Sequence, residues 1–65
     1  MFIKFESDDK KTFTNIPVED CTKATIRKRF GKSYFSYVYN VYGIDKNGIS
    51  YSKSVPKDEY NTYMI

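Results

Sequence analysis

The chain has 65 residues, of which 40% are hydrophobic and 18% aromatic, and its formal net charge is +3. This length predicts one domain, residues 1–65, with a small core. One cysteine excludes an internal disulfide, and the absence of histidine excludes the commonest general base and every histidine-containing zinc site. No apolar run approaches the roughly 20 residues that span a bilayer, and the charged N-terminus does not resemble a signal peptide. We therefore expect a cytoplasmic protein without membrane contact.

The charges are distributed unevenly along the chain. Residues 1–21 hold three lysines against five acids, a charge of −2, and residues 58–65 hold two acids. Residues 22–57 hold eight lysines or arginines against Asp45 alone, a charge of +7. A basic middle between acidic ends predicts an anionic partner for the middle.

The first 30 residues predict a hairpin followed by a segment that allows two interpretations. Residues 2–6 and 12–16 are typical of short strands, and the polar residues 7–11 between them predict a turn. Pro17 ends the second strand because it has no amide proton to donate. Residues 18–30 allow two interpretations: a turn or short helix at 18–22 followed by a strand at 23–30, which we favour, or one helix over 18–30 in a ββαββ order.

The second half of the chain gives clearer signals. Residues 33–44 are rich in Tyr, Phe and Val, and predict the longest strand, placed centrally in the sheet. The turn at 45–48 ends in Gly48, which suits a left-handed backbone position. A strand at 49–55 and a short helix at 57–64 follow. The predicted fold is thus a small β-rich protein, all-β or α+β, in which an N-terminal hairpin joins a three-stranded antiparallel meander.

Turn lengths predict which residues share a face of the meander. A two-residue loop at Gly31 and Lys32 pairs Phe30 with Ser33. The same register places Arg29 opposite Tyr34 and Arg27 opposite Ser36.

The second loop, residues 46–48, pairs Asp45 with Ile49 and Tyr42 with Ser52. Both loops place apolar residues on one face, which supports the meander because a one-residue slip moves a whole strand to the other face. Among these residues we expect Phe35 to be a core residue and Tyr37 and Tyr39 to be largely buried. The predicted core face holds Ala24, Ile26, Phe30, Phe35, Tyr37, Tyr39, Val41, Ile49, Tyr51 and Val55.

The opposite face combines basic, aromatic and hydroxyl side chains. Guanidinium groups bind phosphates and guanine, Asn binds adenine, and Tyr stacks or donates a hydrogen bond. An ordinary solvated sheet face has a similar composition and remains the alternative. The predicted nucleic-acid-binding residues are Arg27, Arg29, Lys32, Tyr34, Ser36, Asn40, Tyr42 and Ser52.

Residues 25–57 have an order of strands and turns that resembles a known family. The basic strand 25–30, Gly31-Lys32 turn, aromatic strand, Asp45-to-Gly48 turn and Ser52-Lys53-Ser54 strand resemble the arm-type DNA-binding domain of tyrosine recombinases. In that family a three-stranded sheet inserts into the DNA major groove, and a longer helix packs behind it. The resemblance implies DNA contacts at Arg27, Arg29, Tyr34 and Ser52. It also implies that the N-terminal hairpin covers the core in place of the longer helix. We expect no recombinase catalytic domain in residues 1–65.

Binding is favoured over catalysis. The adjacent acids at 8–9 and 19–20 do not form a predicted metal or acid–base pair, and Cys21 is expected to be a small buried residue. We expect no enzymatic activity, metal or cofactor. The leading hypothesis is a small nucleic-acid-binding protein, such as a phage or mobile-element accessory factor. The alternatives are a compact protein-interaction module or inhibitor of a larger enzyme, and a homodimer paired through its tyrosine-rich strand.

Overall fold

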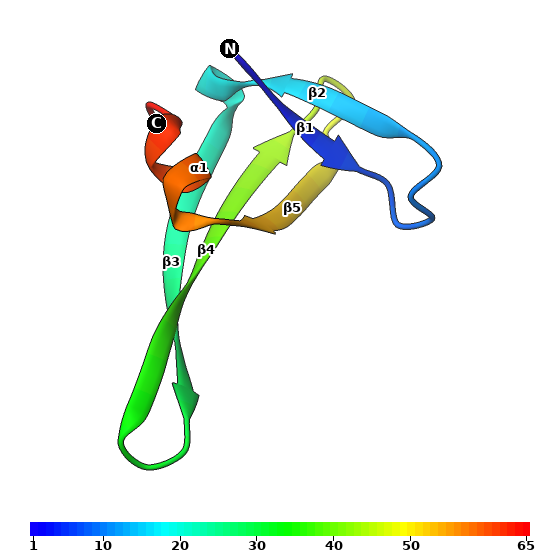
Figure 1. Ribbon diagram of the computed structural model, residues 1–65. Helices are drawn as coiled ribbons and strands as arrows, with labels where there is room; N and C mark the ends of the chain where they lie inside the picture. Colours follow the sequence, from blue (N-terminus) through cyan, green and yellow to red (C-terminus); the bar gives the residue numbers. More distant parts are fainter.

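The computed structural model describes residues 1–65 and contains two antiparallel sheets (Figure 1). A two-stranded sheet pairs β1 with β2, and a three-stranded sheet has the order β3-β4-β5. The elements are β1 (Phe2–Glu6), β2 (Phe13–Pro17), the 3₁₀ helix η1 (Val18–Asp20), β3 (Cys21–Phe30), β4 (Tyr34–Ile44), β5 (Ser50–Val55) and α1 (Lys57–Thr62).

This architecture confirms the predicted hairpin, meander and two short helices. The strand β4 has 11 residues, more than any other element, and lies between β3 and β5. The alternative helix over 18–30 is wrong, since only Val18–Asp20 is helical and Cys21–Phe30 is a strand. The β-branched residues Thr22, Thr25 and Ile26 favour this outcome, because they pack well on a pleated sheet and lose rotamer freedom in a helix.

The turn between β4 and β5 has the predicted register. Asp45 donates its amide to the carbonyl of Ile49 at 3.0 Å, and Gly48 adopts the left-handed conformation at φ +82°. The Asp45 carboxylate also accepts from the amides of Asn47 and Ile49, both at 2.9 Å. These local bonds hold the loop at three residues and place Tyr42 opposite Ser52, as predicted.

The register between β3 and β4 differs from the prediction by one residue. Phe30 pairs with Tyr34, so the loop contains the three residues 31–33 and Gly31 takes the left-handed position at φ +78°. Arg29 therefore lies opposite Phe35, and Arg27 lies opposite Tyr37. The predicted pairs of Arg29 with Tyr34 and Arg27 with Ser36 are wrong, and every residue of β3 lies on the face opposite to the predicted one.

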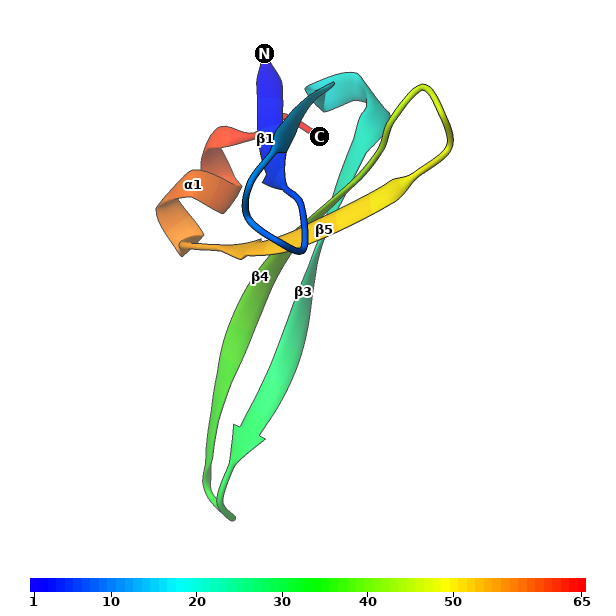
Figure 2. The same ribbon diagram turned by 90° about the vertical axis from the view of Figure 1, so that its right-hand side faces the viewer.

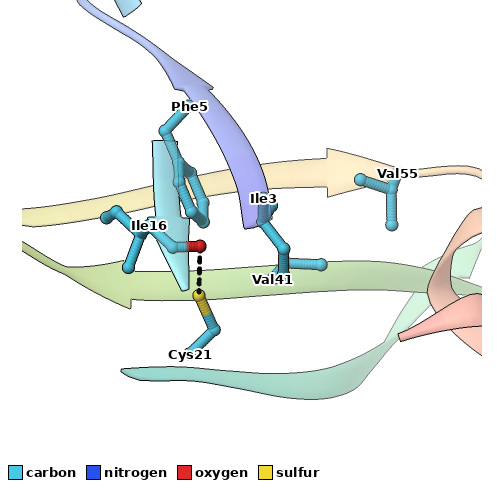
Figure 3. Packing of buried hydrophobic residues seen from close by; sticks show 6 residues of the cluster. All are labelled: Ile3, Phe5, Ile16, Cys21, Val41 and Val55. Carbon is cyan, nitrogen blue, oxygen red and sulfur yellow. Dashed lines mark hydrogen bonds between the residues drawn. The ribbon is translucent and has the colours of Figure 1, made fainter. Parts of the chain in front are cut away.

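The core lies between the N-terminal hairpin and one end of the three-stranded sheet (Figure 3). Phe5 and Ile3 of β1 and Ile16 of β2 point toward the sheet, where they meet the side chains of β3, β4 and β5. Cys21 is 3% exposed, which confirms its predicted burial, and its thiol donates to the Pro17 carbonyl at 3.4 Å. The whole buried hydrophobic cluster is Ile3, Phe5, Ile16, Cys21, Val41 and Val55.

Gly43 allows the hairpin to approach the sheet closely. It is buried, and a Cβ at this position would lie 2.9 Å from Ile16 Cδ1 and 2.9 Å from Phe5 Cε2. Gly in a strand interior commonly marks such a close approach. Any side chain here would push the hairpin away from β4.

The predicted core is only partly correct. Val41 and Val55 are buried, and Tyr39 and Tyr51 pack against the core from its margin. The prediction that Phe35 and Tyr37 are buried is wrong, because they are 49% and 51% exposed. The hairpin covers only the end of the sheet where β4 pairs with β5 (Figure 1). The remaining residues wrongly placed in the core are Ala24, Ile26, Phe30 and Ile49, all of them exposed.

A lysine fixes the C-terminal helix against the sheet. Lys23 Nζ donates to the carbonyls of Tyr60 at 3.0 Å and Tyr63 at 2.8 Å, and lies 4.4 Å from the centre of the Tyr60 ring. A cation at this end of a helix also interacts favourably with the helix dipole. Tyr60 packs against Tyr39 of β4, with ring centres 5.1 Å apart. No helix of the chain is long and apolar enough to cross a bilayer.

Candidate nucleic-acid interface

The outer halves of β3 and β4 form an arm that leaves the body of the protein (Figures 1 and 2). Strand β5 pairs with β4 only over Tyr39–Ile44, so residues 26–30 and 34–38 form a two-stranded ribbon joined by the loop 31–33. We refer to residues 26–38 as the arm. Five residues per strand at about 3.4 Å each give it a length of about 14 Å or more. The elongated shape, 42 × 28 × 18 Å, reflects this extension.

The arm carries more than the entire net positive charge of the chain. Its charged residues are Arg27, Lys28, Arg29 and Lys32, without any acid, which gives +4 against +3 for the whole chain. The charges of the other residues therefore sum to −1. The two arginines lie on one face of the ribbon, Lys28 lies on the other, and Lys32 lies in the loop at its tip. The arm thus presents a positive field in every direction.

These four cations have no acidic partner within the protein. The one salt bridge of the chain joins Lys53 to Glu59 at 3.8 Å, in the body. Lys23 and Lys53 donate to backbone carbonyls and stabilise the fold, with Lys53 Nζ 2.6 Å from the Lys4 carbonyl. None of the four arm cations makes such a bond. Their charge is consequently available to an anion from outside.

The arm also exposes aromatic rings on both faces. Phe35 and Tyr37 lie on the face of the arginines, with ring centres 5.9 Å apart and planes at 88°. Phe30 and Tyr34 form a cross-strand pair on the other face, with ring centres 6.0 Å apart. All four rings are about half exposed or more, at 49% to 65%. Clustered exposed rings of this kind mark an interaction surface.

The structure divides the predicted site between two faces and two regions. Arg27 and Arg29 share a face with Tyr37 and Phe35, whereas Tyr34 and Ser36 lie on the opposite face. The arrangement in which both arginines flank Tyr34 and Ser36 is therefore wrong. Lys32, by contrast, is exposed in the loop at the tip of the arm, between the two strands.

The other three predicted residues lie in the body. Ser54 donates its hydroxyl to the Asn40 amide oxygen at 2.7 Å, so one of the two lone pairs of that oxygen is already used. Tyr42 and Ser52 line a shallow cleft of about 310 Å³ together with Asp20. The Asp20 carboxylate makes this cleft unfavourable for a phosphate. The arm is therefore a better candidate interface than the body.

Sequence reasoning missed Lys28, Phe30, Phe35 and Tyr37 as candidate site residues. The predicted core face includes the three rings, but the hairpin leaves this end of the sheet uncovered. A signal was present nonetheless: residues 26–38 combine four cations and four aromatic residues without one acid. That composition is typical of nucleic-acid-binding segments.

A second hollow surface of the protein carries a net negative charge. A cleft of about 850 Å³ lies between β2 and the turn after β4, and Asp20, Asp45 and Lys46 supply its charged lining. The Asp45 carboxylate already accepts the turn amides described above. At the edge of this region, burial and the nearby Asp20 and Glu19 raise the pKa of the Cys21 thiol, which keeps it in the less nucleophilic protonated form. No group of three or more His, Cys, Asp or Glu side chains is placed to hold a metal ion.

Comparisons with protein-family models, curated proteins and solved structures give no match to this chain. The resemblance to the recombinase arm-type domain thus stays a prediction. Function has to be inferred from the arm itself.

Proposed function

We propose that this protein binds nucleic acid through the arm. The observation that carries the proposal is the coincidence of four unpaired cations and four exposed rings on one protruding ribbon that contains no acid. Cations without internal partners gain most from phosphate, since a phosphate chain brings many negative charges to one surface. Nucleic acid is abundant in the cytoplasm, where we expect the protein to act.

The distribution of charge disfavours the homodimer hypothesis at this surface. Two copies meeting at the arm would bring two +4 segments together without any acid to compensate. An acidic protein is the second candidate partner, favoured by the exposed Phe and Tyr rings, which are common at protein-binding hot spots. The two partners differ in how strongly their binding depends on salt.

The test is an anisotropy titration with labelled oligonucleotides over a salt series. Four phosphate contacts give a slope of log K against log salt of about −2.8 for single strands and about −3.6 for duplex DNA. We expect the double variant Arg27→Gln, Arg29→Gln to halve this slope and to weaken binding at low salt. The matched control is Lys10→Gln, Lys11→Gln, which removes the same charge from the β1–β2 loop and should leave the slope nearly unchanged.

Two results would reject the proposal. One is equal weakening by both double variants, which would mean that only net charge matters. The other is an absence of binding to any oligonucleotide at low salt, which would leave the acidic protein partner as the better explanation.

A further inference from the structure

We infer that the nucleic acid is single-stranded and that its bases stack on the arm face formed by Arg27, Arg29, Phe35 and Tyr37, which we call the stacking face. This inference rests on the proposed function and adds the class of ligand and the mode of contact. The inference follows from the aromatic rings that the arm exposes next to its cations.

The stacking face combines rings and guanidinium groups at short range. Phe35 and Tyr37 are alternate residues of β4, so both project from the same face of the ribbon. The Arg27 guanidinium lies 5.2 Å from the centre of the Phe35 ring, and Arg29 pairs directly with Phe35 across the strands. Phe35 and Tyr37 both remain about half exposed. A base can therefore contact a ring while its phosphate reaches an arginine.

A duplex offers little to the exposed rings of such a surface. Bases within a duplex are stacked on one another, and proteins read their polar edges with Arg, Asn, Gln and similar side chains. The arm contains no Asn or Gln, and its uncharged side chains are mainly rings and aliphatic groups. A single strand exposes the faces of its bases, and stacking on aromatic rings beside a basic track is the usual way in which proteins hold it.

The experiment compares a labelled dT₁₂ strand with a labelled 12-base-pair duplex at one low salt concentration. We expect the single strand to bind more tightly. Phe35→Leu and Tyr37→Leu should each weaken binding of dT₁₂ by roughly 5- to 150-fold, because base–ring stacking contributes at that scale. Leucine keeps an apolar strand residue at positions that are half exposed, so both variants should fold, which circular dichroism would verify.

Phe13→Leu is the matched control. Phe13 is also an exposed ring beside a cation, at 57% exposure and with Lys4 Nζ 4.0 Å from its centre, but it lies on β2, outside the arm. Its replacement should leave dT₁₂ binding within about twofold of the unsubstituted protein.

The outcomes separate this inference from the proposed function. If the duplex binds as tightly as dT₁₂ or more tightly, the inference is overturned and nucleic-acid binding stands. The same conclusion follows if the ring variants bind dT₁₂ normally while the arginine double variant does not. If neither oligonucleotide binds, the proposed function itself fails.

Discussion

Replacing Phe5 and Phe35 separately with alanine tests where the core ends. The Phe5 ring is 0% exposed, lies 6.0 Å from the Tyr51 ring and closes over Gly43. Phe5→Ala should therefore cost about 3–5 kcal/mol of unfolding free energy, from lost burial and the cavity left behind. Phe35 is 49% exposed. Since full burial of such a ring stabilises by about 1.5–3 kcal/mol, Phe35→Ala should cost only half as much, about 0.7–1.5 kcal/mol.

The assay is urea unfolding, monitored by far-ultraviolet circular dichroism. The unfolding free energies of both variants are compared with the same dependence on urea concentration. A chain of this length has a total stability of about 3–10 kcal/mol. Phe5→Ala should therefore remove about a third of this stability or more, and at the low end of the range it should leave a large unfolded fraction even without urea. Phe35→Ala should remain folded with a slightly lower midpoint. If Phe35→Ala lowers the unfolding free energy as much as Phe5→Ala or more, the rings of the arm belong to the hydrophobic core. That result would refute their assignment to binding.

Two further predictions concern the body of the protein. Gly43→Ala should lower the unfolding free energy by about 1–3 kcal/mol, because its methyl group would overlap Phe5 and Ile16; an unchanged urea midpoint would contradict the close approach. Burial, together with the 2.7 Å hydrogen bond to Glu59, raises the pKa of Tyr63 from 10.0 to about 12. Between these values the unfolded chain has released a proton that the folded chain keeps, so stability should fall as pH rises from 10 to 12. Over this range the melting temperature should fall less steeply with pH for Tyr63→Phe than for the unsubstituted protein. Equal dependence of the two melting temperatures on pH would argue against the raised pKa.

The sequence predicts the elements well because their boundaries carry specific local chemistry. The turn after β4 is an example: Asp45 and Gly48 are suited to it by side-chain hydrogen bonding and by left-handed backbone geometry, and the register that they predict is the observed one. The core on the hairpin side could not be predicted to the same degree. Nothing in the sequence shows that Ile3, Phe5 and Ile16 pack over only one end of the long β3–β4 pair.

The register of the arm could not be predicted, for a physical reason. Both alternating sets of β4 contain aromatic residues, Tyr34 in one set and Phe35 with Tyr37 in the other. In β3, Ile26 and Phe30 alternate with arginines, so either pairing gives each face a mixture of rings and cations. Gly31 is compatible with a loop of two residues or of three. Register is strongly specified only where one face is buried, and neither face of the arm is buried.

The ambiguity of the arm and its proposed role have the same origin. A ribbon of two strands is marginally stable by itself, so exposed rings on both faces are unfavourable for the free protein and contribute little to folding. A segment selected only for stability would carry polar residues here, or would be covered as the other end of the sheet is covered. The arm instead keeps rings at 49% to 65% exposure beside cations that have no acidic partner in the protein. Such departures from local folding rules are expected at functional sites, where a ligand supplies the missing contacts.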